Sequence, residues 1–231
     1  MGRRVAAFFD LDCTLLTVNS GALWIKRERR LGRLTRKEYL QGLFYLVAYR
    51  LNMIDMEQAM GRALLTIKGE REEVVRQWTR DWYYDEVAGR VAPGARRALF
   101  AHRRAGHPLV LLSTTSPYQA EVVAEHLSLD GCIHSGYEVR DGVFTGEFVQ
   151  PLCYAEGKVI LAERYAREHD LDLDRSFFYS DSASDLPMLG RVGEPRVVNP
   201  DARLRWKARR EGWPILDWRG VSQRSSELPG L

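Results

Sequence analysis

The sequence lacks the features that would mark a secreted, membrane-spanning or zinc-binding chain. It holds three cysteines among 231 residues, and Cys13, Cys132 and Cys153 are too few and too widely spaced for a disulfide framework or a zinc site. No uninterrupted apolar run reaches the roughly 20 residues that a membrane helix needs. The net charge is only +3, which is too small to argue for nucleic acid as a partner. We therefore expect a cytoplasmic protein with no nucleic-acid partner and no membrane span.

Proline is absent between residues 20 and 88, and this segment differs from the rest of the chain. It is rich in Arg, Glu, Leu and Met. The basic run at 26–37 is interrupted by Glu28 and predicts a solvated helix face. Apolar residues recur at helical spacing, namely Leu40, Leu43, Phe44, Val47 and Leu51. We expect a small helical bundle with this apolar stripe in its core; contact with a lipid-like substrate or a dimer partner is the alternative.

The remaining sequence alternates between strand and helix patterns. The apolar run at 5–9 suits a buried parallel strand, and similar runs at 108–112 and 176–179 are separated by helical patterns. Such alternation implies a parallel α/β sheet. We therefore predict a Rossmann-like α/β core formed by residues 1–16 and 89–231, with an α-helical cap domain inserted at 17–88.

Polar residues follow three of the predicted strands. Asp10 and Asp12 come directly after the first, Ser113 after the second and Asp181 after the third. Ligands of open α/β sheets bind where the carboxyl ends of the strands meet. We expect these side chains to meet at one edge of the sheet, with Lys158 approaching from a helix.

Four carboxylates at this edge, Asp10, Asp12, Asp181 and Asp185, would repel one another without a cation. Oxygen ligands and retained water suit magnesium. Magnesium and Lys158 together would neutralise a phosphate group. One carboxylate can then attack phosphorus to give an aspartyl-phosphate, which water splits. A second carboxylate two residues further on can protonate the leaving oxygen and later deprotonate the water.

Four short motifs occur in a characteristic order. They are Phe-Phe-Asp-Leu-Asp-Cys-Thr-Leu at 8–15, Leu-Leu-Ser-Thr at 111–114, Glu-Gly-Lys at 156–158 and Tyr-Ser-Asp-Ser-Ala-Ser-Asp-Leu-Pro at 179–187. Together they resemble the motifs of the haloacid dehalogenase (HAD) superfamily. The helical insert is similar to the cap of the phosphoserine phosphatase-like branch, as is Val-Asn-Pro-Asp at 198–201.

The resemblance implies roles for the acidic residues. Asp10 would be the nucleophile and a magnesium ligand. Asp12 would be the general acid and base, with its backbone carbonyl on the metal. Asp181 would complete the metal shell, and Asp185 would support it or bind the metal through water.

The resemblance also implies which residues hold the phosphate group: Ser113, Thr114 and Lys158. Taken singly, Ser113 could be only a helix cap and Lys158 only a surface lysine. Their places in the ordered motif series favour the phosphate-binding role.

The sequence departs from the phosphoserine phosphatase pattern at one point. In those enzymes a glutamate shortly after the first motif recognises the substrate's amino group, whereas the stretch at 17–21 contains no carboxylate. We therefore expect a main substrate other than phosphoserine. Asn19, Ser20 and Trp24 are expected to shape the substrate pocket instead.

The function that these residues favour is magnesium-dependent hydrolysis of a small organic phosphomonoester. Phosphoserine phosphatase proper remains an alternative, as does a phosphotransferase or mutase, because Asp12 fits either acceptor. An alternative from another class is a non-catalytic phosphate-binding regulator, which would not need the nucleophile Asp10. A dehalogenase is disfavoured because those enzymes typically lack the second aspartate of the first motif. The oligomeric state is left open.

Overall fold

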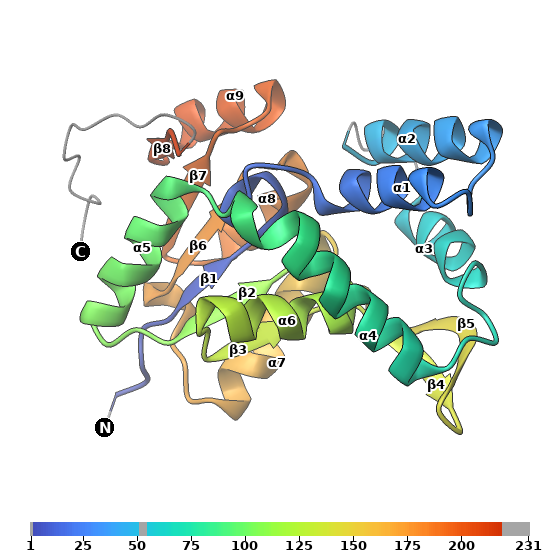
Figure 1. Cartoon of the computed structure of the whole chain (residues 1–231). Coiled ribbons are helices and arrows are strands. Elements are labelled where there is room, and N and C mark those ends of the chain that lie inside the picture. The colour runs from blue at the N-terminus through green and yellow to red at the C-terminus, as the bar shows by residue number, and fades with distance from the viewer. Residues whose placement is uncertain (1, 51–54, 219–231) are drawn as a thin grey trace.

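A six-stranded parallel sheet forms the centre of the molecule (Figure 1). The computed structural model describes residues 2–50 and 55–218, except for the side chains of residues 47, 49 and 50. The strand order is β3-β2-β1-β6-β7-β8, and every neighbouring pair is parallel. The predicted parallel α/β fold is confirmed. The strands are β1 (Ala7–Phe9), β2 (Leu109–Leu112), β3 (Gly131–Ile133), β6 (Phe177–Ser180), β7 (Glu194–Val198) and β8 (Ile215–Leu216).

Helices cover both faces of the sheet because successive strand residues point to opposite sides. Phe9 belongs to the apolar cluster on one face, with residues of α5 (Pro93–Arg104) and α6 (Pro117–Leu127). Phe8 belongs to the cluster on the other face. That second cluster includes residues of α7 (Glu156–Glu168), α8 (Leu186–Arg191) and α9 (Ala202–Glu211).

The segment after β1 is helical, as its composition predicts. It contains α1 (Ser20–Arg30), α2 (Arg36–Arg50), α3 (Met56–Leu65) and α4 (Glu72–Trp82). No helix within the described residues has both the length and the apolar character that crossing a membrane requires.

The segment leaves and rejoins the sheet through paired backbone. Leu16 bridges Val91 in antiparallel fashion, and the Ala92 N–H donates to the Leu15 carbonyl at 2.9 Å. The Thr17 N–H donates to the Arg90 carbonyl at 2.8 Å. The two ends of the insertion are therefore neighbours.

α4 and the residues just before it attach the helical segment to the rest of the protein. Arg80 of α4 forms a two-pronged ion pair with Glu125 of α6, at 2.7 and 2.8 Å. The Gly69 N–H donates to the Phe144 carbonyl, and the Glu72 N–H donates to the Gly142 carbonyl. These bonds extend a hairpin of β4 (Gly136–Arg140) and β5 (Val143–Val149), whose turn is Asp141-Gly142, a residue pair typical of tight hairpin turns.

The expectation that the apolar stripe of α2 forms the bundle core is wrong for Leu40 and Phe44, each 64% exposed. α2 instead packs on α1 through Gly42, where a Cβ atom would lie 3.1 Å from Ile25 Cδ1. The missing side chain lets the two helices approach on that face, which turns Leu40 and Phe44 outward. Two members of the stripe cannot be assigned: Leu51 and the Val47 side chain lie outside the described part of the chain.

Candidate active site

Asp10 and Asp181 follow neighbouring strands of the sheet. Phe9 of β1 is in register with Tyr179 of β6, and the Asp10 N–H donates to the Tyr179 carbonyl at 2.9 Å. Both aspartates are buried, with exposed fractions of 8% and 5%. The parallel register therefore brings these two residues to the same edge, although 171 positions of sequence separate them.

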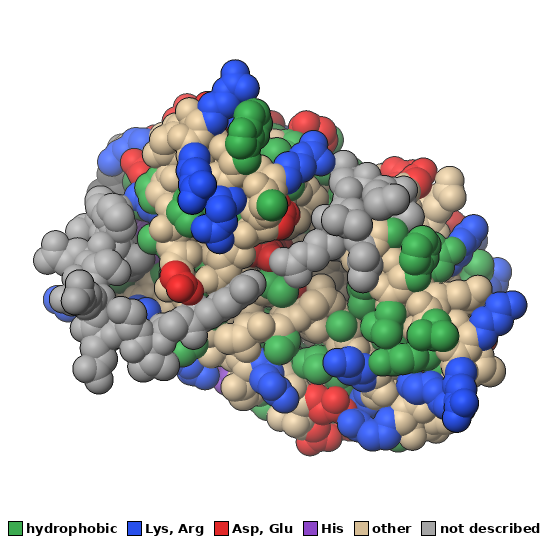
Figure 2. Space-filling view, turned by 90° about the horizontal axis from the view of Figure 1, so that it is seen from above, with side chains coloured by type: hydrophobic (Ala, Val, Ile, Leu, Met, Phe, Trp, Pro, Cys, Tyr) green, Lys and Arg blue, Asp and Glu red, His purple; other side chains and the backbone are tan. Residues whose placement is uncertain are grey.

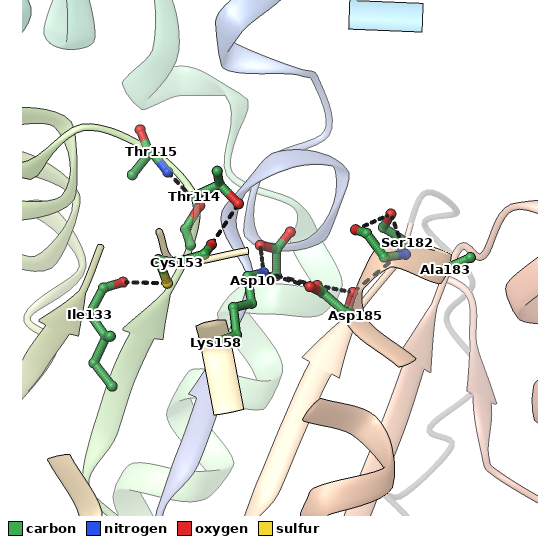
Figure 3. Close-up of polar contacts among 12 residues, drawn as sticks. Asp10, Thr114, Thr115, Ile133, Cys153, Lys158, Ser182, Ala183 and Asp185 are labelled. Carbon is green, nitrogen blue, oxygen red and sulfur yellow. Dashed lines mark hydrogen bonds and ion pairs between the residues drawn. The ribbon is translucent and has the colours of Figure 1, made fainter. Parts of the chain in front are cut away.

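Lys158 reaches this edge from the first turn of α7. Its Nζ lies 2.8 Å from Asp10 Oδ1 and 2.9 Å from Asp185 Oδ2, as Figure 3 shows. The approach depends on Gly157, since a Cβ atom there would lie 1.9 Å from the Leu152 carbonyl oxygen. The lysine is 2% exposed, so its ammonium and the two carboxylates form a buried ionic cluster.

Ser180, which the sequence reasoning missed, orients Asp185. Its hydroxyl donates to Asp185 Oδ2 at 2.6 Å, and both residues are fully or almost fully buried. Ser180 is the last residue of β6, so a polar residue ending a buried strand was the available signal. Ser182 caps the following turn by accepting from the Ser184 N–H. The loop after β6 is thus held by short-range hydrogen bonds that fix Asp185.

Burial raises the pKa of Asp10 to about 7. The Lys158 ammonium opposes this shift, while the carboxylates of Asp185 and Asp12 add to it. A single cation thus does not fully offset desolvation and like-charge repulsion at this point. An additional positive charge next to Asp10, the candidate nucleophile, would lower its pKa and favour the ionised carboxylate.

Asp12 is held by the helical segment. Its Oδ1 accepts from the Ser20 N–H at 2.9 Å. Cys13, between Asp12 and α1, has a φ of +57°, and its N–H donates to the Val18 carbonyl at 3.1 Å. Asn19 caps α1, since its Oδ1 accepts from the Ala22 N–H at 2.9 Å. Ser20 and Asn19 therefore support the site from the start of α1.

Trp24 packs edge-on against Trp82 of α4, with ring centroids 5.0 Å apart and an interplanar angle of 89°. Trp24 is half-buried and belongs to the margin of the apolar cluster beneath α4. Its ring helps join α1 to α4.

The loop after β2 carries Ser113 and Thr114. Ser113 is buried, and its N–H donates to the Ile133 carbonyl at 3.0 Å. The Thr114 hydroxyl donates to the Cys153 carbonyl at 2.8 Å, so its proton is already engaged (Figure 3). This bond connects the Ser113 loop to the segment that leads into Lys158, a connection that the sequence did not predict.

The donor set suits a hard cation such as magnesium. Asp10, Asp181 and Asp185 are buried carboxylates that follow β1 and β6, and Lys158 Nζ lies 2.9 Å from both carboxylate oxygens of Asp185. Within the described ranges, no group of three or more His, Cys, Asp or Glu side chains is placed to hold a metal ion. The magnesium site therefore stays a prediction that rests on ligand chemistry.

A model of the haloacid dehalogenase-like hydrolase family matches residues 7–190, which include Asp10, Ser113, Lys158 and Asp181. The chain belongs to this family. The predicted family of this HAD-like hydrolase is confirmed, and the match begins at β1 and ends within α8.

Relatives of this HAD-like hydrolase span nearly its whole length. It is 32% identical over 232 residues to the "Inhibition of morphological differentiation protein" of Streptomyces azureus, covering 99% of this chain and 83% of that one. It is 33% identical over 228 residues to "Phosphoserine phosphatase SerB1" of Mycobacterium tuberculosis, covering 96% and 73%. It is 27% identical over 218 residues to "Histidinol-phosphatase" of Neisseria meningitidis, covering 92% and 98%.

Solved structures share the fold. A Bordetella pertussis protein of unknown function superposes with a TM-score of 0.84 at 27% identity, covering 94% of this chain and all of that one. A substrate-bound phosphoserine phosphatase superposes with a TM-score of 0.69 at 17% identity, covering 96% of each chain. At that identity the second likeness concerns the fold alone.

Proposed function

We propose that this HAD-like hydrolase removes the phosphate group from a small organic phosphomonoester, with magnesium, through an aspartyl-phosphate formed on Asp10. The observation that carries the proposal is the buried cluster in which Lys158 Nζ lies 2.8 Å from Asp10 and 2.9 Å from Asp185, at the strand edge that also holds Asp181. A buried carboxylate beside a buried ammonium is the arrangement that an anionic substrate and a carboxylate nucleophile need.

The enzyme class follows from the family. The matching family is one of hydrolases, and relatives that align with most of this chain are named as phosphatases. The chain is therefore a phosphoric monoester hydrolase, and this prediction is confirmed. The finer statements on metal, intermediate and substrate are our proposal.

In the first step Asp10 attacks phosphorus, so that an oxygen–phosphorus bond forms and the ester bond breaks. Asp12 gives its proton to the leaving alcohol oxygen. In the second step Asp12 takes a proton from water as the water oxygen attacks phosphorus, and the bond between phosphorus and Asp10 breaks. Asp10 is free again and inorganic phosphate leaves.

The other residues position the phosphate group. Lys158 supplies positive charge next to Asp10, and Ser113 follows β2 at the same edge of the sheet. The Thr114 backbone is the part of that residue available to phosphate, because its hydroxyl donates to Cys153. Magnesium, held by Asp10, Asp181 and the Asp12 carbonyl with Asp185 beside them, would supply charge that keeps Asp10 ionised and neutralises the phosphate oxygens.

We further propose that residues 17–88 act as a cap over the core formed by 1–16 and 89–231. The paired backbone at Leu16 and Val91 marks the junction, and the start of α1 contacts Asp12. Asn19, Ser20 and Trp24 would shape the pocket from this side. A cap that excludes water strengthens every charge interaction at the site.

For the substrate, the relatives named phosphoserine phosphatase and histidinol-phosphatase suggest small phosphorylated amino compounds. The absence of a carboxylate at 17–21 favours a compound other than phosphoserine. The full chain should be assayed for phosphate release from p-nitrophenyl phosphate and a panel of phosphorylated metabolites, including phosphoserine and histidinol phosphate. Chelation should abolish turnover and magnesium should restore it; undiminished activity in chelator would contradict the metal role. Transfer of phosphate to an added alcohol in preference to water would favour a phosphotransferase.

A further inference from the structure

One side of α2 combines apolar and basic side chains that face outward. Residues 36, 37, 40 and 44 lie on one stripe of the helix, because positions three and four apart share a face. Leu40 and Phe44 are 64% exposed each, and Arg36 and Lys37 are also exposed. We refer to these four residues as the α2 outer face.

The other sides of α2 are already occupied. Gly42 and Leu46 face α1, where they meet Ile25 and Gly21. Tyr45 faces α3, where Arg62 donates to its hydroxyl and lies over its ring. The α2 outer face is thus the side of the helix that these neighbours leave to solvent.

The start of α2 is fixed by a capping box. Glu38 Oε2 accepts from the Thr35 N–H at 2.8 Å and from the Thr35 hydroxyl at 2.7 Å. The acidic residue of the first turn is therefore used for capping, on the side opposite the α2 outer face. The positive charges of Arg36 and Lys37 are not offset by it on that face.

Basic charge extends beyond these two residues. The stretch 26–37 holds seven Lys or Arg residues and one acidic residue, Glu28. Glu28 lies 3.4 Å from Arg27 and from Arg33, so it is already shared between two of the seven. Figure 2 shows hydrophobic side chains and Lys or Arg side chains side by side on the part of the molecule that carries α1 and α2.

We propose that the α2 outer face docks on the surface of a bilayer that contains anionic lipid. Leu40 and Phe44 would enter the boundary between headgroups and acyl chains, while Arg36 and Lys37 would lie at the anionic headgroups. A second copy of the chain fits less well, because it would place basic stretches opposite one another. This docking is peripheral, and it does not depend on the proposed phosphatase mechanism.

The test is vesicle flotation of the purified full chain at low salt. Vesicles of phosphatidylcholine alone are compared with vesicles of phosphatidylcholine and phosphatidylglycerol. We expect binding to the anionic vesicles only. The variants L40S/F44S and R36E/K37E should each lower the bound fraction by about tenfold, while hydrolysis of p-nitrophenyl phosphate in solution stays unchanged.

Matched controls come from other surfaces. Phe100 of α5 is 61% exposed, so F100S removes an equally exposed phenyl ring. R205E/R209E reverses two exposed charges on α9. Both controls should float like the wild type.

Several outcomes would overturn the proposal. These are no binding to either vesicle, equal binding to both, unchanged binding of the α2 variants, or equal losses in the controls. A dimer that forms without lipid and is abolished by L40S/F44S, detected by light scattering, would assign the face to a second copy instead. Thermal melting of L40S/F44S and the wild type distinguishes misfolding from loss of docking. A variant that melts like the wild type and still binds anionic vesicles as the wild type does would contradict the proposal.

Discussion

Lys158 Nζ lies 2.8 Å from Asp10 Oδ1, although 148 positions of sequence separate the two residues. The same ammonium lies 2.9 Å from Asp185, so it is the positive charge that lies between two buried carboxylates. Removing one partner from such a cluster leaves charge buried without compensation, and this costs more stability than the pair itself contributes.

The first prediction concerns this cluster. K158M should lower the free energy of unfolding by about 3–5 kcal/mol in metal-free buffer, because Asp10 and Asp185 lose their shared cation. Urea unfolding measures the change. K207M on α9 removes a lysine from an exposed pair with Glu211 and should change stability little. Equal decreases in the free energy of unfolding of K158M and K207M would mean that the buried cluster stabilises the fold no more than an exposed ion pair does.

The second prediction concerns the nucleophile. D10N should reduce turnover of p-nitrophenyl phosphate by about 10⁴-fold or more, because the amide cannot form the aspartyl-phosphate. Circular dichroism should show an unchanged fold. D141N makes the same substitution in the β4–β5 turn, where φ is +50° and Asn is well tolerated, and it should keep full activity. Substantial turnover by D10N would reject Asp10 as the nucleophile.

The third prediction concerns pH. His102 is fully buried, with Nε2 2.9 Å from the Tyr179 hydroxyl and Nδ1 2.9 Å from His107 Nδ1. The pKa of His102 is lowered to about 3, chiefly by burial and in smaller part by the positive charge of neighbouring His107 and Arg196. In the unfolded chain the histidine pKa is about 6.5. Between these values the unfolded state binds a proton that the folded state does not, so stability falls as pH falls.

The expected slope from this one group is about 1.4 kcal/mol per pH unit between its two pKa values. Urea unfolding at about pH 7 and about pH 4.5 measures it. H102Q retains a hydrogen-bonding side chain without the titration, so its stability should depend less steeply on pH than that of the wild type. Identical pH dependence of the two proteins would show that His102 is not the group responsible.

The fourth prediction concerns substrate preference. N19D keeps an oxygen that can cap α1, and it adds a carboxylate at the stretch where this chain has none. Turnover of phosphoserine relative to p-nitrophenyl phosphate should rise several-fold, since the carboxylate attracts the ammonium group. N19A is the control, because it weakens the cap and adds no charge. If N19D and N19A show the same ratio of kcat/KM values, Asn19 does not face the substrate.

Much of the fold could be predicted because its strands are short apolar runs that end in polar motif residues. The strands ending before Asp10 and Asp181, and the Asp141-Gly142 turn, are encoded by neighbouring residues. Their parallel pairing then brings distant residues to one edge. The short elements α8 and β8 lack such local patterns and were not predicted.

The finer contacts depended on packing that sequence spacing does not contain. Spacing placed Leu40 and Phe44 on one face of α2 but did not indicate which face α1 would cover. In the structure α1 packs on the face that carries Gly42. Motif order placed Thr114 near phosphate but did not reveal that its hydroxyl bonds to Cys153. Ser180 became important only once β6 and its following turn brought it to Asp185.

The paired junction at Leu15–Thr17 and Arg90–Ala92 has a consequence for how this architecture can vary. Because the exits are hydrogen-bonded to each other, a longer or shorter insertion could replace residues between them without moving the strand that carries Asp10. Trp82 and Tyr83, however, belong to the insertion and fill the apolar cluster on the sheet. The backbone junction would therefore accept a different insertion. Each new insertion, however, would have to supply large aromatic side chains that occupy the positions of Trp82 and Tyr83 in the apolar cluster.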